Sequence, residues 1–275
     1  MQFDYDLVGK IGSMALIRPE DNDIDYNILS RIGAELKPGM IWVSSGATEI
    51  GRIDYMKRNG GQALFGATED IKTDYAAQGQ AILMNNYRMF VPAQYSIRQV
   101  LVEHGHFNDA TKREHIRQLL LRASRQGAIP IVNYNDPVSD EETRRMEILS
   151  LRNADSGVVE CVDNDETAAV ISILVRARTL LVLSNIEGVY KDAKDPSTLV
   201  QEVCATNAEE LERKVEELIL SCVGASREGA NGAGAKLRYV LPAAKQGTRV
   251  IIGHARHKIQ ALLNGDIPCT NIYLK

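Results

Sequence analysis

The segment from Ala128 to Asp136 reads AIPIVNYND, and its pattern decides the fold. Residues Ala128–Asn133 are short, branched and apolar and end in a polar amide, as expected of a strand buried in a parallel sheet. Four other runs share this pattern: Asp6–Ile11, Met40–Val43, Thr179–Ser184 and Arg249–Gly253. The sequence therefore predicts five buried strands.

Longer amphipathic stretches separate these strands. They predict helices at Asp74–Phe90, Ala110–Gln126, Thr167–Arg176, Ala208–Ile219 and Ala235–Gln246. Alternating strands and helices predict an α/β three-layer sandwich with a mostly parallel central sheet. No repeat or linker interrupts the chain, so we expect one domain over residues 1–275. Ligands of such sheets bind at the carboxyl ends of strands, where the candidate site residues should lie.

Two segments lack this pattern. Arg52–Thr73 is rich in Gly, Lys, Arg and Asp with weak periodicity, which predicts an exposed flap. Ser139–Asp163 is highly charged and predicts a short surface helix.

The composition narrows the classes of partner. The 275 residues are 44% hydrophobic and 25% charged, which suits a globular protein with a sizeable core. The net charge of −4, without a Lys/Arg cluster, argues against a nucleic-acid partner. The chain begins without an apolar leader and has no membrane-length apolar run, so we expect a cytoplasmic protein with no membrane partner. The cysteines are far apart and the histidines have no ligand spacing, so we expect free thiols and no metal site.

Polar motifs follow the first two strands. Gly9-Lys10-Ile11-Gly12-Ser13 places a lysine between glycines, where it could meet a phosphate oxygen or simply be solvated in a turn. It is not a P-loop, whose G-x-x-x-x-G-K-[ST] frame is absent from the chain. Val43-Ser44-Ser45-Gly46-Ala47 could open a helix toward an anion, or Ser45 could be an ordinary cap.

Three further motifs carry candidate ligand groups. Asn133–Pro137 and Val162–Asp165 combine amides and carboxylates that could hold an amino acid or position lysines and Mg²⁺, or could form Asx-turns. The glycine-rich stretch Gly229–Lys236 suits a loop that folds over nucleotide phosphates, with Lys236 reaching the transferred group.

In order along the chain, these motifs resemble glutamate 5-kinases of the amino-acid-kinase superfamily. Lys10–Ser13 resembles the family's K-[LVI]-G-[TS], and Val43–Arg52 (VSSGATEIGR) resembles its SSGAIAAGR. Further similar segments are Gly79-Gln80 with Leu83-Met84 (GQ…LM), Ile129–Asp136 (IPI[IV]NEND), Asp163–Asp165 (GDND), Leu183–Pro196 (LTD.DGLY..DP), Gly229–Lys236 (GTGGMxTK) and the closing Leu263–Tyr273.

The resemblance implies an amino-acid-kinase fold and transfer of the γ-phosphoryl group of ATP, with Mg²⁺, to the carboxylate of a small acid. Lys10 and Lys236 would neutralise the transferring group, and Asp165 would hold both lysines. The acidic substrate would bind Ser45, Gly46, Asn135, Asp136 and Asn164. The nucleotide would bind Gly12, Ser184, Asn185, Tyr190, Gly229, Gly232, Gly234 and Lys236. Acceptor residues would thus fall in about 1–165 and nucleotide residues in about 166–275, and the family's habit implies a homo-oligomer, a dimer or tetramer.

The chain departs from the family pattern at several places. Tyr134 replaces the Glu of NEND, so its phenol either alters the acceptor pocket or points away from it. Asn185 and Glu187 replace two aspartates, and the segment from Asp136 to Asp163 is longer than usual. The resemblance also stops before the PUA domain of many members, which implies a short form.

Two other functions stay open. A uridylate-type nucleoside-monophosphate kinase would need phosphate-binding arginines at the acceptor site, for which Arg52 is the candidate. A weakly catalytic sensor of amino acid or nucleotide would fit the altered NEND and TD motifs.

Overall fold

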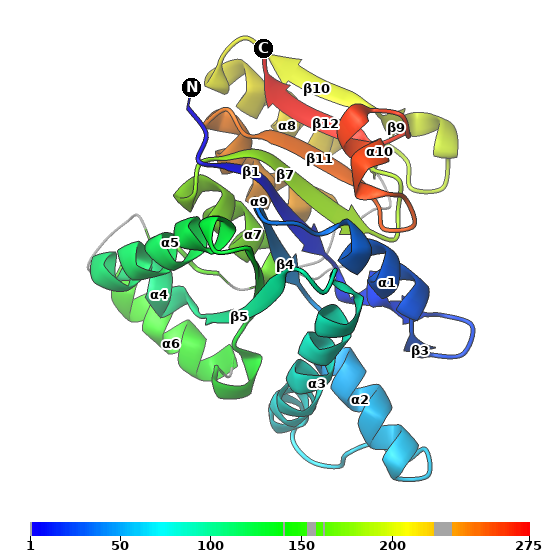
Figure 1. The fold of residues 1–275 in the computed structure, drawn as a ribbon. Coiled ribbons are helices and arrows are strands. Elements are labelled where there is room, and N and C mark those ends of the chain that lie inside the picture. The colour runs from blue at the N-terminus through cyan, green and yellow to red at the C-terminus, as the bar shows by residue number, and fades with distance from the viewer. Residues whose placement is uncertain (1, 140, 153–157, 162, 223–232) are drawn as a thin grey trace. The chain divides into compact units, whose positions relative to one another are not determined.

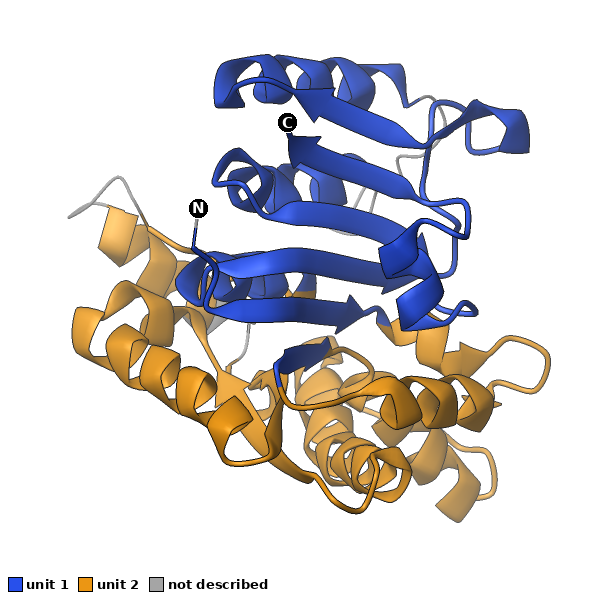
Figure 2. Ribbon diagram, turned by 45° about the horizontal axis from the view of Figure 1, so that its top comes forward, with its two compact units in different colours: residues 1–12, 39–43, 165–275 blue, residues 13–38, 44–164 orange. Residues whose placement is uncertain are grey.

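The computed structural model describes residues 2–139, 141–152, 158–161, 163–222 and 233–275. The chain forms two compact units, coloured separately in Figure 2. Unit 1 contains residues 1–12, 39–43 and 165–275, and unit 2 contains residues 13–38 and 44–164.

Unit 1 is built on strands in the order β10-β12-β11-β7-β1-β4. These are β1 (Tyr5–Ile11), β4 (Met40–Ser44), β7 (Ala177–Ser184), β10 (Glu202–Ala205), β11 (Arg249–His254) and β12 (Thr270–Leu274). Strand β7 pairs in parallel with both β1 and β11, whereas β12 runs antiparallel to β11. The sheet of this unit is therefore mostly parallel, as predicted.

Helices cover the strands of unit 1. They are α7 (Asn164–Leu174), α8 (Ala208–Ser221), α9 (Ala233–Lys245) and α10 (Ile259–Asn264). In Figure 1, α8 and α9 lie behind β10, β11 and β12, and α10 lies in front of them. A small hairpin of β8 (Val189–Tyr190) and β9 (Leu199–Val200), with a 3₁₀ turn at Pro196–Thr198, follows β7.

Unit 2 contains the parallel pair β5 (Ser96–Val102) and β6 (Ala128–Tyr134). Its helices are α1 (Tyr26–Glu35), α2 (Ala47–Arg58), α3 (Thr68–Phe90), α4 (His104–Asn108), α5 (Ala110–Arg125) and α6 (Glu141–Arg152). A hairpin of β2 (Ile17–Arg18) and β3 (Asp23–Ile24) and 3₁₀ turns at Ser13–Leu16 and Asp136–Val138 complete it.

The five predicted strands and five predicted helices are confirmed, with ends that differ by a few residues except at α3, which begins six residues early. The predicted surface helix in Ser139–Asp163 is α6. Of the described strands longer than two residues, three are missed, namely β5, β10 and β12, and the two-residue strands β2, β3, β8 and β9 were not predicted either. Strand β5 carries Arg98 and Gln99 beside its apolar residues and pairs within unit 2 only with β6, so its sequence does not read as a buried strand.

The predicted exposed flap at Arg52–Thr73 is confirmed only in part: residues 57–63 and 65–68 are exposed, but helices occupy both ends of the segment. Helix α2 extends to Arg58, and α3 begins at Thr68. Their backbones touch at two glycines: a Cβ on Gly51 would lie 1.8 Å from the carbonyl oxygen of Tyr75, and one on Gly79 would lie 1.8 Å from that of Ala47. Because glycine lowers helix propensity, the residues that permit this packing also hide the helix in the sequence.

A close approach also fixes the strand that carries Lys10. A Cβ on Gly9 would lie 2.0 Å from the ring of Trp42, which is fully buried in β4. Lys10 is held in register opposite Val182 of β7.

Among the helices described, none is long and apolar enough to span a membrane.

Candidate active site

Two lysines of unit 1 share one carboxylate. Lys10 lies near the end of β1, Asp165 in the first turn of α7 and Lys236 in the first turn of α9. The Nζ atom of Lys10 lies 2.7 Å from Oδ1 of Asp165, and that of Lys236 lies 2.7 Å from Oδ2. The side chains of Lys10 and Asp165 are each 4% exposed, and that of Lys236 is 15% exposed. The structure thus brings together all three predicted catalytic residues.

The charge of this lysine–aspartate cluster favours an anionic ligand. Burial alone would raise the pKa of Asp165, but the charges and hydrogen bonds of Lys10 and Lys236 outweigh it and hold that pKa below its usual value. Two ammonium groups then face one carboxylate, which leaves about one positive charge where water is scarce. The starts of α7 and α9 add positive potential. Such a cluster suits the charge that develops on a transferring phosphoryl group.

Gly12 provides bare backbone beside the cluster. Its N–H donates to the carbonyl of Leu183 at 3.1 Å. A Cβ built on Gly12 would lie 3.6 Å from Nζ of Lys10, an ordinary contact, so the fold itself would admit a methyl group. The absence of a side chain therefore leaves room next to the ammonium group.

Ser184, Asn185 and Tyr190 follow the strand end of β7. Ser184 is buried opposite His254, and its carbonyl accepts from the N–H of Ala255 at 2.8 Å. Asn185 is exposed, and Tyr190 is half-buried in β8. Gly234 lies in the first turn of α9, where an added Cβ would lie 3.3 Å from Ile219. Gly229 and Gly232 lie outside the described residues.

Glu187 is fixed by two side chains from the loop after β11. His257 Nε2 lies 2.7 Å from Oε2 of Glu187, and Arg256 pairs with the other oxygen. This replacement for the family's aspartate therefore joins the segments that follow β7 and β11.

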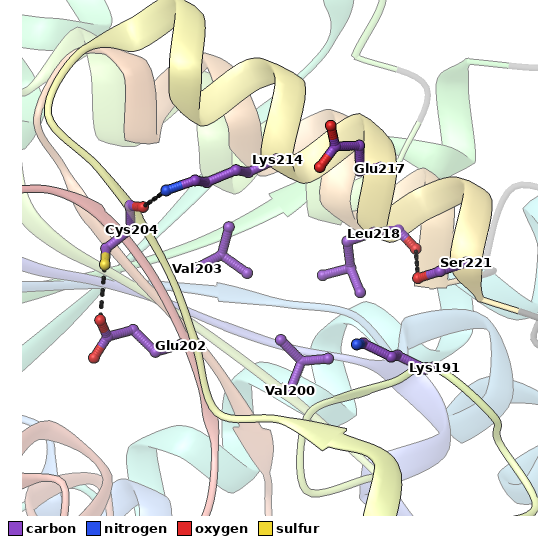
Figure 3. A pocket seen from close by; sticks show the side chains of 9 residues that line it. All are labelled: Lys191, Val200, Glu202, Val203, Cys204, Lys214, Glu217, Leu218 and Ser221. Atoms are coloured by element: carbon purple, nitrogen blue, oxygen red, sulfur yellow. Dashed lines mark hydrogen bonds between the residues drawn. The ribbon is translucent and has the colours of Figure 1, made fainter.

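Unit 1 also contains a cavity of about 510 Å³ that the sequence did not indicate (Figure 3). The residues that line it run in sequence from Lys191, directly after Tyr190, to Ser221 in the last turn of α8. Its lining mixes the apolar side chains of Val200, Val203 and Leu218 with the charged ones of Lys191, Glu202, Lys214 and Glu217. Its volume and mixed lining suit a nucleoside-sized group.

In unit 2, Ser45 and Gly46 lie where the chain enters α2. Gly46 is the N-cap, with φ of 107°, and a Cβ there would lie 3.0 Å from Leu16. Glycine is therefore required by both conformation and space. The buried hydroxyl of Ser44 bonds Tyr87 at 2.8 Å, whereas Ser45 is half-buried. The predicted helix opening is present.

Amides cluster at the carboxyl end of β6. Asn164 accepts the N–H of Tyr134 at 3.1 Å and donates to Oδ1 of Asn133 at 3.2 Å. Asn133 is buried, and its Nδ2 has no hydrogen-bond partner among the described residues. Asn135 donates to Glu103 at 2.7 Å. The sequence-based site includes neither Asn133 nor Glu103; the first lies in a quoted motif, and the second gave no signal.

Asp136 follows this cluster and has an unusual carboxyl group. Burial raises its pKa to about 6, against a lowering by the charge of Arg144. Within the described part of the chain, its carboxylate takes part in no hydrogen bond or ion pair. A half-buried carboxylate without a partner favours a cationic ligand.

Tyr134 points into the packing of unit 2. Its side chain is 1% exposed, and its hydroxyl lies 3.1 Å from Oγ of Ser139 and 3.5 Å from Nδ1 of His104. The phenol is therefore held by α4 and the segment before α6.

The class of protein follows from the parallel α/β architecture, the lysine–aspartate cluster and a family match. The sequence model of the amino acid kinase family matches residues 7–254, and the chain belongs to this family. It is 14% identical to a carbamate kinase from Giardia lamblia bound to AMP-PNP, with a TM-score of 0.60 over 98% of this chain and 99% of the other. An isopentenyl phosphate kinase gives 14% identity and a TM-score of 0.54. These likenesses confirm the predicted amino-acid-kinase fold.

Within the family, the chain is similar to glutamate 5-kinases. It is 30% identical to the one from Gloeobacter violaceus over 94% of this chain and 66% of the relative. It is 29% identical to that of Alkaliphilus metalliredigens over 96% of this chain and 94% of the relative. The chain spans 66% and 64% of the first two relatives, just under two thirds of their length.

Proposed function

We propose that this chain transfers the γ-phosphoryl group of Mg·ATP to the side-chain carboxylate of L-glutamate, giving glutamyl 5-phosphate as in proline biosynthesis. The observation that carries the proposal is the buried cluster of Lys10, Asp165 and Lys236 in unit 1. The similarity to glutamate 5-kinases supports the choice of acceptor.

The reaction asks little of the protein beyond position and charge. A carboxylate is already a nucleophile at neutral pH, so no general base is needed. Its oxygen attacks the γ-phosphorus while the bond to the β,γ-bridging oxygen breaks, and ADP leaves. Lys10 and Lys236 would stabilise charge on the transferring group, and Asp165 would keep both ammonium groups aligned.

The nucleotide would bind unit 1. The phosphates would lie against the bare backbone of Gly12 and against Ser184 at the end of β7. The cavity lined by residues from Lys191 to Ser221 would take the nucleoside part. Among the residues described, no group of three His, Cys, Asp or Glu side chains forms a metal cage. Mg²⁺ would be supplied with ATP and would neutralise part of the charge on its phosphates.

The acceptor would bind residues of unit 2. Asp136, without an ion pair among described residues, would receive the ammonium group of glutamate. Ser45, Gly46, Asn135 and Asn164 would contact the remaining polar groups. We further propose a cytoplasmic homo-oligomer, a dimer or tetramer, whose mass multi-angle light scattering would measure.

The uridylate-kinase alternative is weakened by Arg52. Its guanidinium is already bonded to Glu49 at 2.9 Å and to Asn22 at 3.0 Å, so it is not poised for an acceptor phosphate. The intact lysine–aspartate cluster likewise favours an active kinase over a weak sensor.

An acceptor panel tests the proposal. Purified chain with Mg·ATP is given L-glutamate, L-aspartate, UMP or no acceptor, and ADP release is measured. Hydroxylamine traps acyl phosphates as hydroxamates, so hydroxamate formation that depends on glutamate is the expected result. ADP release with UMP alone, or no release with any acid, would contradict the proposal.

A further inference from the structure

Two buried hydroxyl groups lie next to the loop that leads into α2. Ser44 is the last residue of β4, Tyr87 lies on α3, and both side chains are fully buried. Ser44 Oγ donates to the carbonyl oxygen of Ser45 at 3.0 Å and lies 2.8 Å from the hydroxyl oxygen of Tyr87. Both residues belong to unit 2, together with Ser45 and Gly46.

The direction of these hydrogen bonds follows from the number of hydrogen atoms. A serine hydroxyl carries one hydrogen, and that of Ser44 is used on the carbonyl of Ser45. The hydrogen between the two hydroxyl groups must therefore come from Tyr87. Tyr87 thus donates to Ser44, and Ser44 donates to Ser45; we call this arrangement the hydroxyl relay.

The hydroxyl relay fixes the peptide group between Ser45 and Gly46. The C=O and N–H bonds of a trans peptide point in opposite directions. Because the carbonyl of Ser45 is turned toward the buried hydroxyl of Ser44, the N–H of Gly46 is turned away from it. Gly46 is buried, yet no residue in the described part of the chain accepts its N–H. A buried backbone donor normally has a partner, so this N–H is suited to a ligand oxygen.

We propose that Tyr87 and Ser44 are positioning residues for the acceptor. Through the hydroxyl relay they orient the Ser45–Gly46 peptide so that the N–H of Gly46 binds a carboxylate oxygen of the acceptor. The inference rests on the proposed function, which assigns Ser45 and Gly46 to acceptor binding. The positive potential at the start of α2 adds to the attraction of the carboxylate.

The test is a double-mutant cycle of Ser44→Ala and Tyr87→Phe, each of which removes one hydroxyl group. Tyr75→Phe is the matched control, because Tyr75 lies on the same helix, is also buried, and accepts the N–H of Leu64 at 2.7 Å through its hydroxyl. For each protein the KM of L-glutamate, the KM of ATP and the melting temperature are measured. Calorimetry without nucleotide gives the dissociation constant of L-glutamate.

Ser44→Ala should raise the KM for glutamate about tenfold and Tyr87→Phe about fivefold, as expected for a lost hydrogen bond, while the KM for ATP stays unchanged. Because both hydroxyl groups act on the same peptide, the double variant should also lose about tenfold, whereas independent effects would multiply to about 50-fold. Tyr75→Phe should keep both KM values, even if its melting temperature falls.

Equal rises in the KM values for glutamate and ATP would overturn the inference and leave the two hydroxyl groups only a packing role. An unchanged KM for glutamate in Ser44→Ala, effects that multiply in the double variant, or an equal rise in Tyr75→Phe would overturn it too. If the wild type binds glutamate but transfers nothing, the proposed function fails, and the same pattern in the dissociation constants would still support the inference. If the wild type does not bind glutamate, the inference fails with it.

Discussion

The Nζ atom of Lys10 lies 2.7 Å from Oδ1 of Asp165, although the two residues come from β1 and from the start of α7. Both side chains are almost fully buried. Because Asp165 also holds Lys236, its carboxylate determines where two positive charges stand, and the following predictions test that arrangement.

Lys10→Met and Lys236→Met should each lower kcat about 100- to 1,000-fold, the usual cost of losing one electrostatic contact to a transition state. The fold should persist, because Asp165 keeps one lysine partner in each variant. Steady-state kinetics and circular dichroism measure the two effects. Lys245→Met is the control, because Lys245 lies at the far end of α9 and pairs with Glu212. Wild-type turnover in Lys10→Met or in Lys236→Met would show that the lysine concerned has no role in the mechanism.

Asp165→Asn should reduce stability as well as activity, because it leaves two buried ammonium groups without a counter-charge. Breaking a buried pair in this way costs about 3–5 kcal/mol. The native pKa of Asp165 lies below its unfolded value, so its contribution is full above about pH 4 and is lost as the pH falls through the native pKa. Urea unfolding of both proteins at pH 7 and at about pH 2.5 should show the difference shrinking with acid. A difference independent of pH would argue against an ionised Asp165.

Gly12→Ala should impair catalysis without harming the fold. The new methyl group would lie 3.6 Å from Nζ of Lys10, which the protein tolerates but which occupies space next to the ammonium group. We expect kcat/KM for ATP to fall at least about tenfold, as for a misplaced charge contact, with little change in melting temperature. Gly105→Ala, whose new Cβ would meet nothing within 4 Å, is the control. If Gly12→Ala is fully active, phosphate does not approach there.

The cluster shows how far the sequence alone could lead. Lys10 and Lys236 stand in glycine-rich surroundings, and Asp165 stands in a polar motif at a helix start, so each was identifiable locally. Their resemblance to known motifs then implied that they meet. The pairing of Arg144 with Tyr134 gave no such signal, because it depends on how α6 docks. The same holds for Glu187 and His257, which are 70 residues apart.

The strands and helices likewise divide into those with a clear local sequence pattern and those without one. Buried strands such as β6 are apolar throughout and could be predicted, whereas β10 mixes charged and apolar residues in only four positions. Helix α2 was hidden because Gly51 and the polar residues around it weaken the helical pattern that packing against α3 restores.

Acceptor affinity should depend on pH through Asp136, whose native pKa is about 6. Protonation removes the charge that would hold the ammonium group, so the KM for glutamate should rise about tenfold between pH 7 and pH 5. The KM of Asp136→Asn should be high and should vary little with pH. A wild-type KM that stays constant from pH 7 to pH 5 would exclude Asp136 from ammonium binding.

The same raised pKa makes Asp136 costly for stability at neutral pH. The folded state holds the proton of Asp136 more tightly than the unfolded state. The stability that this protonated carboxyl group contributes is therefore present below about pH 4 and is lost as the pH rises to about 6. Asp136→Asn should therefore be more stable than the wild type at pH 7, by roughly 3 kcal/mol at most. Denaturant unfolding at pH 4 and pH 7 measures this gain.

Tyr134→Glu restores the residue found in the motif that this chain resembles, and we expect it to weaken the protein rather than improve glutamate turnover. The phenol is fully buried, with its hydroxyl bonded to Ser139 and close to His104. Replacing it should cost about 3 kcal/mol or more, since a large aromatic side chain is lost and a carboxylate is buried in its place. That carboxylate would also lie beneath the guanidinium of Arg144. Tyr134→Phe is the matched control: it keeps the ring under Arg144 and should lose only about 1 kcal/mol with its hydroxyl hydrogen bonds. Melting temperatures and glutamate kinetics of both variants provide the measurement. A Tyr134→Glu protein with wild-type stability and a higher kcat/KM for glutamate would mean that residue 134 faces the acceptor after all.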